Sequence, residues 1–133
     1  MPRATGPFDV SLKPLPMDSE PGSESLGRMS IEKQFRGDLE GTSKGQMLSG
    51  GTAIKNSAAY VAIERVSGSL KGRKGSFILQ HTGLMNRGAP SLTITIVPDS
   101  GTDQLEGLKG TMTINIEAGK HSYQLDYTLA DRA

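Results

Sequence analysis

Residues 60–88 read YVAIERVSGSLKGRKGSFILQHTGLMNRG, two apolar, β-rich runs on either side of a glycine-rich turn. Apolar and polar residues alternate in both runs, which is the period-two pattern of a strand with one buried face. Glu64 and Arg65 interrupt the first run, and Gln80 and His81 interrupt the second. The stretch therefore predicts a long hairpin whose mid-strand ionisable groups either meet solvent or line a polar cavity.

The same alternation continues through most of the chain, and turns rich in glycine or proline separate its segments. We expect eight strands and no stable helix; besides the two strands of the hairpin, they lie near residues 8–12, 29–35, 39–48, 92–96, 108–116 and 121–129. The segment 17–25, MDSEPGSES, reads as a flexible acidic loop, and the RGD tripeptide at 36–38 reads as a hairpin turn. Eight antiparallel strands suggest an up-and-down barrel or a sandwich, and the hairpin-like connections favour an all-β, eight-stranded antiparallel up-and-down barrel over a Greek key.

Small residues occupy one face of the third expected strand, at Gly41, Ser43 and Gly45. Small side chains let a strand curve sharply, or let another group approach its backbone closely. This face is therefore expected to lie at a bend of the barrel or beside an intruding side chain.

Length and composition limit the class of protein. A chain of 133 residues fits one domain over residues 1–133, with about 6–129 in the barrel. The absence of cysteine excludes disulfides and cysteine-based metal sites. A net charge of +1 and the lack of tryptophan give no case for nucleic acid as a partner. No apolar run is long enough for a membrane span, and no secretory signal is evident, so a cytoplasmic protein is expected.

Three blocks carry a resemblance to a known family, namely GRMSIEKQFRGDLEGTSKGQMLS at 27–49, YVAIERVSGSLKGRKGSFILQHTGLM at 60–85 and LTITIVPDSGTDQLEGLKGTMTINI at 92–116. From about Gly6 to Leu129 the chain resembles a bacterial family of small proteins of unknown function with an allene oxide cyclase-like barrel. The resemblance implies an eight-stranded antiparallel barrel with a ligand-sized cavity. It also implies action on apolar substrates without a metal or organic cofactor, commonly as a homo-oligomer. The family supplies no catalytic residue that can be transferred.

The candidate catalytic residues are Glu64 and His81. Period two places Glu64 and Arg65 on opposite faces, so one of them must point inward unless a bulge intervenes. Inside an apolar barrel a glutamate would have a raised pKa and could serve as a general acid or base. The alternative is that Glu64 faces solvent or pairs with a cross-strand lysine or arginine.

His81 shares a face with Phe77 and Leu79, so it is either a proton shuttle or a hydrogen-bonded core histidine. His121 begins the last strand beside a turn and is expected to be exposed. The two histidines have no paired spacing, and no metal site is expected.

The residues expected to contact a ligand are Tyr60, Glu40, Gln80 and Tyr123. The sequence thus predicts a small barrel that binds an apolar or amphipathic molecule in its interior, with cyclase- or isomerase-like acid–base chemistry as an extension. The alternative is a non-catalytic structural or oligomerising barrel. Cavity volume separates the two, because a void under ~100 Å³ falls well short of the ~300 Å³ at the lower end of ligand pockets.

Overall fold

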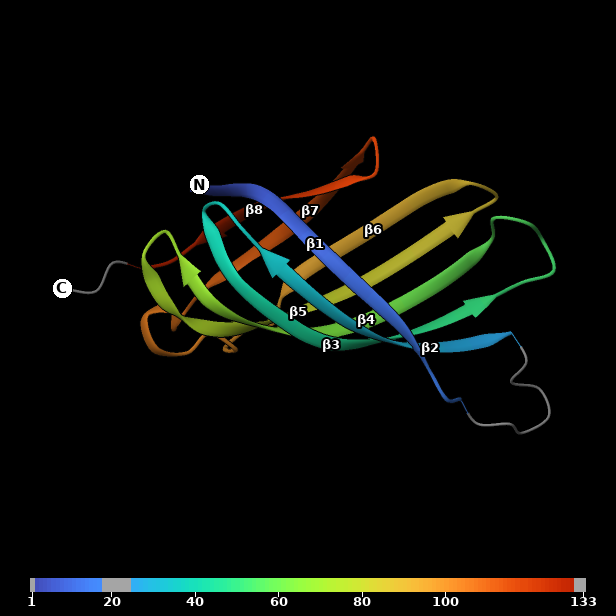
Figure 1. The fold of residues 1–133 in the computed structure, drawn as a ribbon, viewed down its shortest axis with the longest axis horizontal. Coiled ribbons are helices and arrows are strands. Elements are labelled where there is room, and N and C mark those ends of the chain that lie inside the picture. Colours follow the sequence, from blue (N-terminus) through green and yellow to red (C-terminus); the bar gives the residue numbers. More distant parts are fainter. Residues whose placement is uncertain (1, 18–24, 131–133) are drawn as a thin grey trace.

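Eight antiparallel strands close into one barrel in chain order (Figure 1), in a computed structural model that describes residues 2–17 and 25–130. The strands are β1 (Arg3–Leu15), β2 (Leu26–Phe35), β3 (Leu39–Gly51), β4 (Ala58–Leu70), β5 (Arg73–Asn86), β6 (Ala89–Ile96), β7 (Lys109–Glu117) and β8 (Lys120–Thr128), and a 3₁₀ turn, η1 (Asp103–Leu105), lies between β6 and β7. The predicted up-and-down barrel is confirmed. Most of the expected acidic loop, residues 18–24, lies outside the described residues.

Tight turns explain why consecutive strands become neighbours. The β4–β5, β5–β6 and β7–β8 turns are the pairs Lys71-Gly72, Arg87-Gly88 and Ala118-Gly119, and all six residues have positive φ. Two successive positive-φ residues are the mark of a type I′ turn, whose twist matches that of antiparallel strands. The RGD tripeptide also forms a turn, in which the Asp38 carboxylate accepts a hydrogen bond from the Thr5 amide at 3.0 Å.

The β4–β5 hairpin keeps a regular register from end to end, so the period-two prediction applies directly. Ala62 is paired with His81, and Glu64 is paired with Leu79. Glu64 is fully buried in the barrel, and Arg65 is exposed on the outside. Of the two charged neighbours, Glu64 is therefore the one that points inward, and His81 is buried on the same side.

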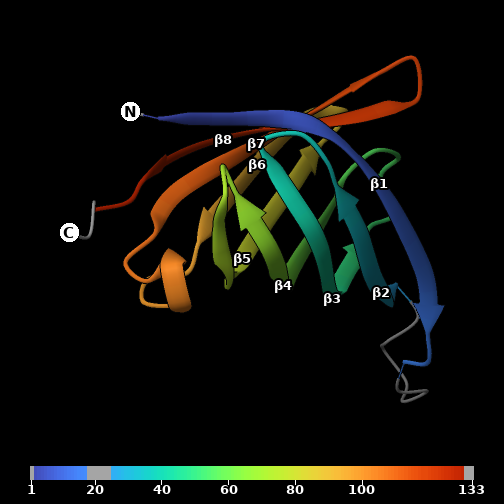
Figure 2. The same ribbon diagram turned by 60° about the vertical axis from the view of Figure 1, so that its left-hand side comes forward.

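One end of the barrel is filled by side chains. Leu39 and Leu70 are paired beside the turns at this end, and η1 adds Leu105, which is also fully buried. Figure 2 shows η1 at the end of the barrel where the β4–β5 turn lies. Just inside, the Phe35 ring lies 5.5 Å from the Tyr123 ring, edge to face. Among the described residues, this plug closes one end of the barrel, and a hollow lies at the opposite end, beside the β5–β6 turn.

The small-residue face of β3 is confirmed as a place of close approach. A Cβ at Gly45 would lie 2.1 Å from the carbonyl oxygen of Ile63 and 2.8 Å from the Cβ of Glu64. Such distances are far inside van der Waals contact, so only glycine leaves room there for the Glu64 side chain.

Leu48, Val61 and Ile63 are exposed aliphatic side chains on the outer surface of β3 and β4, each about half exposed. They line a shallow outer hollow of about 820 Å³ together with charged side chains such as Arg65. In the described part of the chain no helix has the length and apolar character needed to cross a membrane.

Candidate functional site

A buried ionic cluster occupies the middle of the barrel. The Oε2 atom of Glu64 accepts hydrogen bonds from Nζ of Lys33 at 2.8 Å and from Nε2 of His81 at 2.9 Å. The side chains of the three residues are 0%, 6% and 4% exposed, respectively. They come from β4, β2 and β5. Burial of charged groups requires this kind of pairing, because an isolated buried charge is very costly.

The small residues of β3 explain how Lys33 reaches Glu64 across an intervening strand. Lys33 is paired with Ser43, and Gly45 is paired with Glu64. Because neither Ser43 nor Gly45 has a large side chain, the lysine can extend over β3 to the carboxylate. The ammonium group lies 5.2 Å from the centre of the Phe8 ring and 5.8 Å from that of the Phe35 ring, within cation–π range.

The Glu64 carboxylate is ionised. Burial raises its pKa, but the hydrogen bond from His81 and the charge of Lys33 more than offset burial, so the pKa is lowered from its usual value. The expectation of a raised pKa is therefore wrong, because the sequence pattern did not reveal the two donors. An ionised Glu64 cannot serve as a general acid near neutral pH; it holds and orients its neighbours instead. Its Oε1 atom is buried and accepts no hydrogen bond from the described residues.

His81 connects this carboxylate to a tyrosine. Because Glu64 is ionised, Nε2 of His81 carries the proton of that hydrogen bond, and Nδ1 lies 3.4 Å from the Tyr60 hydroxyl. Burial raises the Tyr60 pKa, and the charge of Glu64 raises it further. Tyr60 thus stays protonated and is a hydrogen-bond donor in the chain Glu64–His81–Tyr60.

An interior cavity of about 210 Å³ lies against this cluster. Its polar side chains are Lys33, Tyr60, His81 and His121, and its walls are aliphatic or aromatic: Phe8, Val10, Leu12, Ile31, Met47, Leu92, Ile114 and Ile116. The volume exceeds what a side-chain-filled interior would leave and is below that of a full-size ligand pocket.

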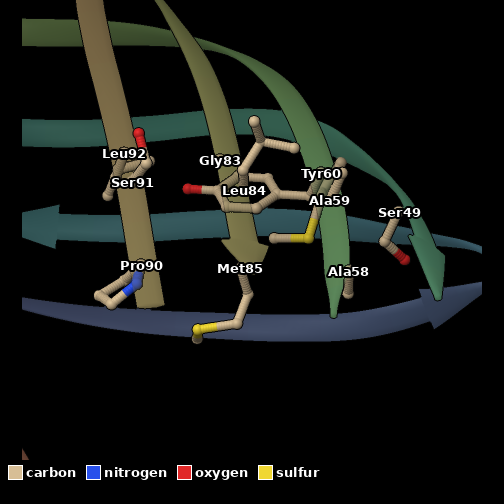
Figure 3. Close-up of a pocket in the computed structure, with 11 residues that line it drawn as sticks. Ser49, Ala58, Ala59, Tyr60, Gly83, Leu84, Met85, Pro90, Ser91 and Leu92 are labelled. Atoms are coloured by element: carbon tan, nitrogen blue, oxygen red, sulfur yellow. The ribbon is translucent and has the colours of Figure 1, made fainter. Parts of the chain in front are cut away.

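A second hollow, of about 370 Å³, continues from the first at the open end of the barrel (Figure 3). Met47, Tyr60 and Leu92 line both spaces. Tyr60 reaches across β5 at Gly83, where a Cβ would lie 2.4 Å from its ring. The two hollows share these three side chains and adjoin each other at Tyr60; together we call them the passage, whose inner end lies at the ionic cluster.

The structure brings Tyr60, Glu64 and His81 together and places the other predicted ligand residues elsewhere. Glu40 and Gln80 are exposed on the outer surface, because alternate residues of a strand face opposite sides and these two face away from the interior. Tyr123 is buried in the plugged end, where its hydroxyl donates to the Arg36 carbonyl at 2.7 Å and accepts from the Leu39 amide at 2.8 Å. Tyr123, Glu40 and Gln80 therefore do not line the interior cavity.

Two residues of the site were missed by sequence reasoning. Lys33 alternates with Ile31 and Phe35, so it lies on the same apolar face of its strand. The alternation argument that was applied to Glu64 would therefore have predicted an inward-facing Lys33. His121 was expected to be exposed, but its ring lies 5.3 Å from that of Phe8, and it lines the cavity. Within residues 2–17 and 25–130 no group of three histidine or acidic side chains is arranged to hold a metal ion.

Comparisons with known proteins identify a family. A family model described as a protein of unknown function, DUF3224, matches residues 4–127. The chain is similar to a protein of unknown function from the same family in Shewanella oneidensis MR-1, at 47% sequence identity. Its crystal structure matches with a TM-score of 0.90, over 98% of this chain and 99% of that chain. No curated protein matches the chain.

Proposed function

The chain belongs to the DUF3224 family of proteins of unknown function, and we propose that its barrel binds an apolar or amphipathic small molecule in the passage that ends at Lys33, Glu64 and His81. One observation carries the proposal: an apolar-walled cavity opens at one end and terminates on a few convergent polar groups. Small-molecule sites typically combine a mostly apolar concave surface with a small number of placed polar groups.

Packing alone is a poor explanation for buried ionic side chains in the middle of the barrel. A structural barrel of this size can fill its interior with aliphatic side chains, as the plugged end does. A buried ion pair is weak evidence for stability, because well-packed apolar residues of similar volume are often as stable or more so. Lys33, Glu64 and His81 in the middle of the barrel therefore favour a role in recognition.

Filling the passage tests the proposal. We expect Leu92→Trp to weaken binding of the neutral fluorescent probe N-phenyl-1-naphthylamine at least tenfold, because Leu92 lines both hollows. Titration of the probe by fluorescence gives the dissociation constant.

The matched control is Thr93→Trp, which adds the same side chain to the exposed outer side of β6. It should bind the probe as the wild type does. Equal weakening by both variants, or none by either, would contradict binding in the passage; absence of binding by the wild type would favour the non-catalytic structural barrel.

A second candidate is acid–base chemistry on the bound molecule, in keeping with the resemblance to allene oxide cyclase-like barrels. The Glu64–His81–Tyr60 chain favours it, since an ionised carboxylate fixes the imidazole and a protonated tyrosine faces the cavity. Tyr60 would turn its O–H from Nδ1 of His81 to the carbonyl oxygen, which gains charge, and the freed Nδ1 would remove a proton from the carbon next to that carbonyl.

We expect the protein to exchange the α-protons of the apolar ketone 2-octanone with deuterium from D₂O, followed by ¹H NMR. His81→Gln should reduce the exchange rate at least a hundredfold, in line with the usual contribution of a general base. Gln80→Ala, at the neighbouring position on the outer surface of β5, should retain it. Exchange that is unchanged in His81→Gln would rule out this chemistry.

A further inference from the structure

We propose that the bound molecule is an apolar carboxylate, with its carboxylate turned inward to Lys33, Tyr60 and His121 and its apolar part in the passage. This inference rests on the proposed function and adds the chemical class of the ligand.

The polar side chains of the inner cavity have one common property. Each of Lys33, Tyr60, His81 and His121 carries an N–H or O–H donor. The N–H of His81 is held by Glu64, whereas Tyr60 can turn its O–H from Nδ1 of His81 to a ligand. Among the described residues, no aspartate or glutamate lines the cavity. The nearest carboxylate, Glu64, is fully buried behind Lys33 and His81, and its Oε2 is already occupied by both. A ligand therefore meets donors and a cation, which calls for an acceptor head group.

Lys33 is the strongest of these donors. Its ammonium group has three N–H bonds, and Glu64 accepts from it at 2.8 Å. Two N–H bonds remain to engage a ligand oxygen. The group lies beside the Phe8 and Phe35 rings and is buried, and charge-assisted hydrogen bonds in a buried site are stronger than in water.

The balance of charge favours a single negative charge on the head group. Lys33 and Glu64 already compensate each other, so a dianion such as a phosphate monoester would bring two uncompensated charges into an apolar site. A carboxylate brings only one such charge, which would lie against the Lys33 ammonium. An amine, in contrast, would meet the Lys33 ammonium, and the described residues place no free carboxylate in the cavity wall.

The passage fits the apolar remainder of such a molecule. Of the described residues that line the outer hollow, Ser49, Ser91 and Tyr60 contribute hydroxyl groups, and the others are apolar. Leu92 and Met47 continue this surface into the inner cavity. A ligand with its head at Lys33 would thus extend its tail toward the open end of the barrel.

Four probes of equal chain length test the assignment: octanoate, 1-octanol, methyl octanoate and octylamine, each titrated into the wild-type protein by isothermal calorimetry at pH 7.5. We expect octanoate to bind at least tenfold more tightly than the other three. Binding of 1-octanol or octylamine as tight as that of octanoate would overturn the carboxylate assignment and leave the proposed function standing. Failure of all four to bind, together with failure of the naphthylamine probe, would overturn both.

Variants locate the head group. Lys33→Met should remove the preference of the protein for octanoate over 1-octanol while changing 1-octanol binding less than threefold. Lys44→Met, at an exposed outer position, should leave the binding of both molecules unchanged.

His121→Phe is the second variant, for use if Lys33→Met does not fold. It keeps a ring beside Phe8 and removes the histidine donors. It should weaken octanoate at least threefold more than 1-octanol. Retention of the full preference in folded Lys33→Met and in His121→Phe would contradict the proposed orientation.

Discussion

Replacement of Glu64 by glutamine is expected to lower the free energy of unfolding by about 3 kcal/mol. The change keeps the shape of the side chain but leaves the Lys33 ammonium, 6% exposed, without its counter-charge. Breaking a buried ion pair from one side is costly for this reason. Urea unfolding followed by circular dichroism measures the difference.

Two further variants define the cause. Glu32→Gln, at an exposed position of β2, should change stability by less than about 0.5 kcal/mol. The double variant Glu64→Gln/Lys33→Met removes both charges and should recover at least about half of the loss, since the two side chains interact directly. A Glu64→Gln protein as stable as the wild type would show that the pair is not buried as described.

Acid should reduce the contribution of Glu64 to the stability of the folded protein. Its pKa in the folded protein is lowered from the usual 4.5, so its stabilisation is complete above pH 4.5 and is lost as the pH falls through the folded value. The difference in stability between the wild type and Glu64→Gln should accordingly shrink below pH 4.5.

Gly45→Ala is the second change with a large expected effect, a loss of about 3 kcal/mol or more. The new Cβ would lie 2.1 Å from the Ile63 carbonyl oxygen and 2.6 Å from the Glu64 Cα. Both atoms belong to the backbone of β4, which can yield only by opening the β3–β4 pairing, so the cost exceeds that of ordinary overpacking. Urea unfolding again measures the loss.

The matched control lies on the same strand. A Cβ at Gly50 would meet the Leu26 Cδ2 at 3.5 Å, which is ordinary contact. Gly50→Ala should therefore be neutral, or stabilise slightly by restricting the unfolded chain. Equal effects at Gly45 and Gly50 would mean that Gly45 does not make room for Glu64.

The fold was predictable because one physical rule repeats through the chain. Period-two alternation placed Phe77, Leu79 and His81 on one face, and the short glycine turns joined neighbouring strands, so the barrel followed from local pattern. The brief η1 turn was not predicted. Its residues show no periodic pattern, and its Leu105 is buried at the plugged end of the barrel.

The site was predictable only in part, because its members come from strands that are distant in sequence. The choice between Glu64 and Arg65 could be posed from alternation, but the inward direction depends on register across the barrel. Lys33 approaches Glu64 over the small residues of β3, an arrangement that single-strand patterns cannot show. For the same reason, the sequence led us to expect a raised Glu64 pKa, whereas it is lowered: the two hydrogen-bond donors, Lys33 and His81, come from other strands.

The most direct test of the account is the position of a bound ligand in solution. With ¹³C-labelled octanoate and the wild-type protein, isotope-filtered NMR should show nuclear Overhauser effects from the ligand chain to Met47, Tyr60 and Leu92, which line the passage. The exposed outer residues Val61 and Ile63 should show none. Overhauser effects confined to Val61 and Ile63 would contradict the interior site.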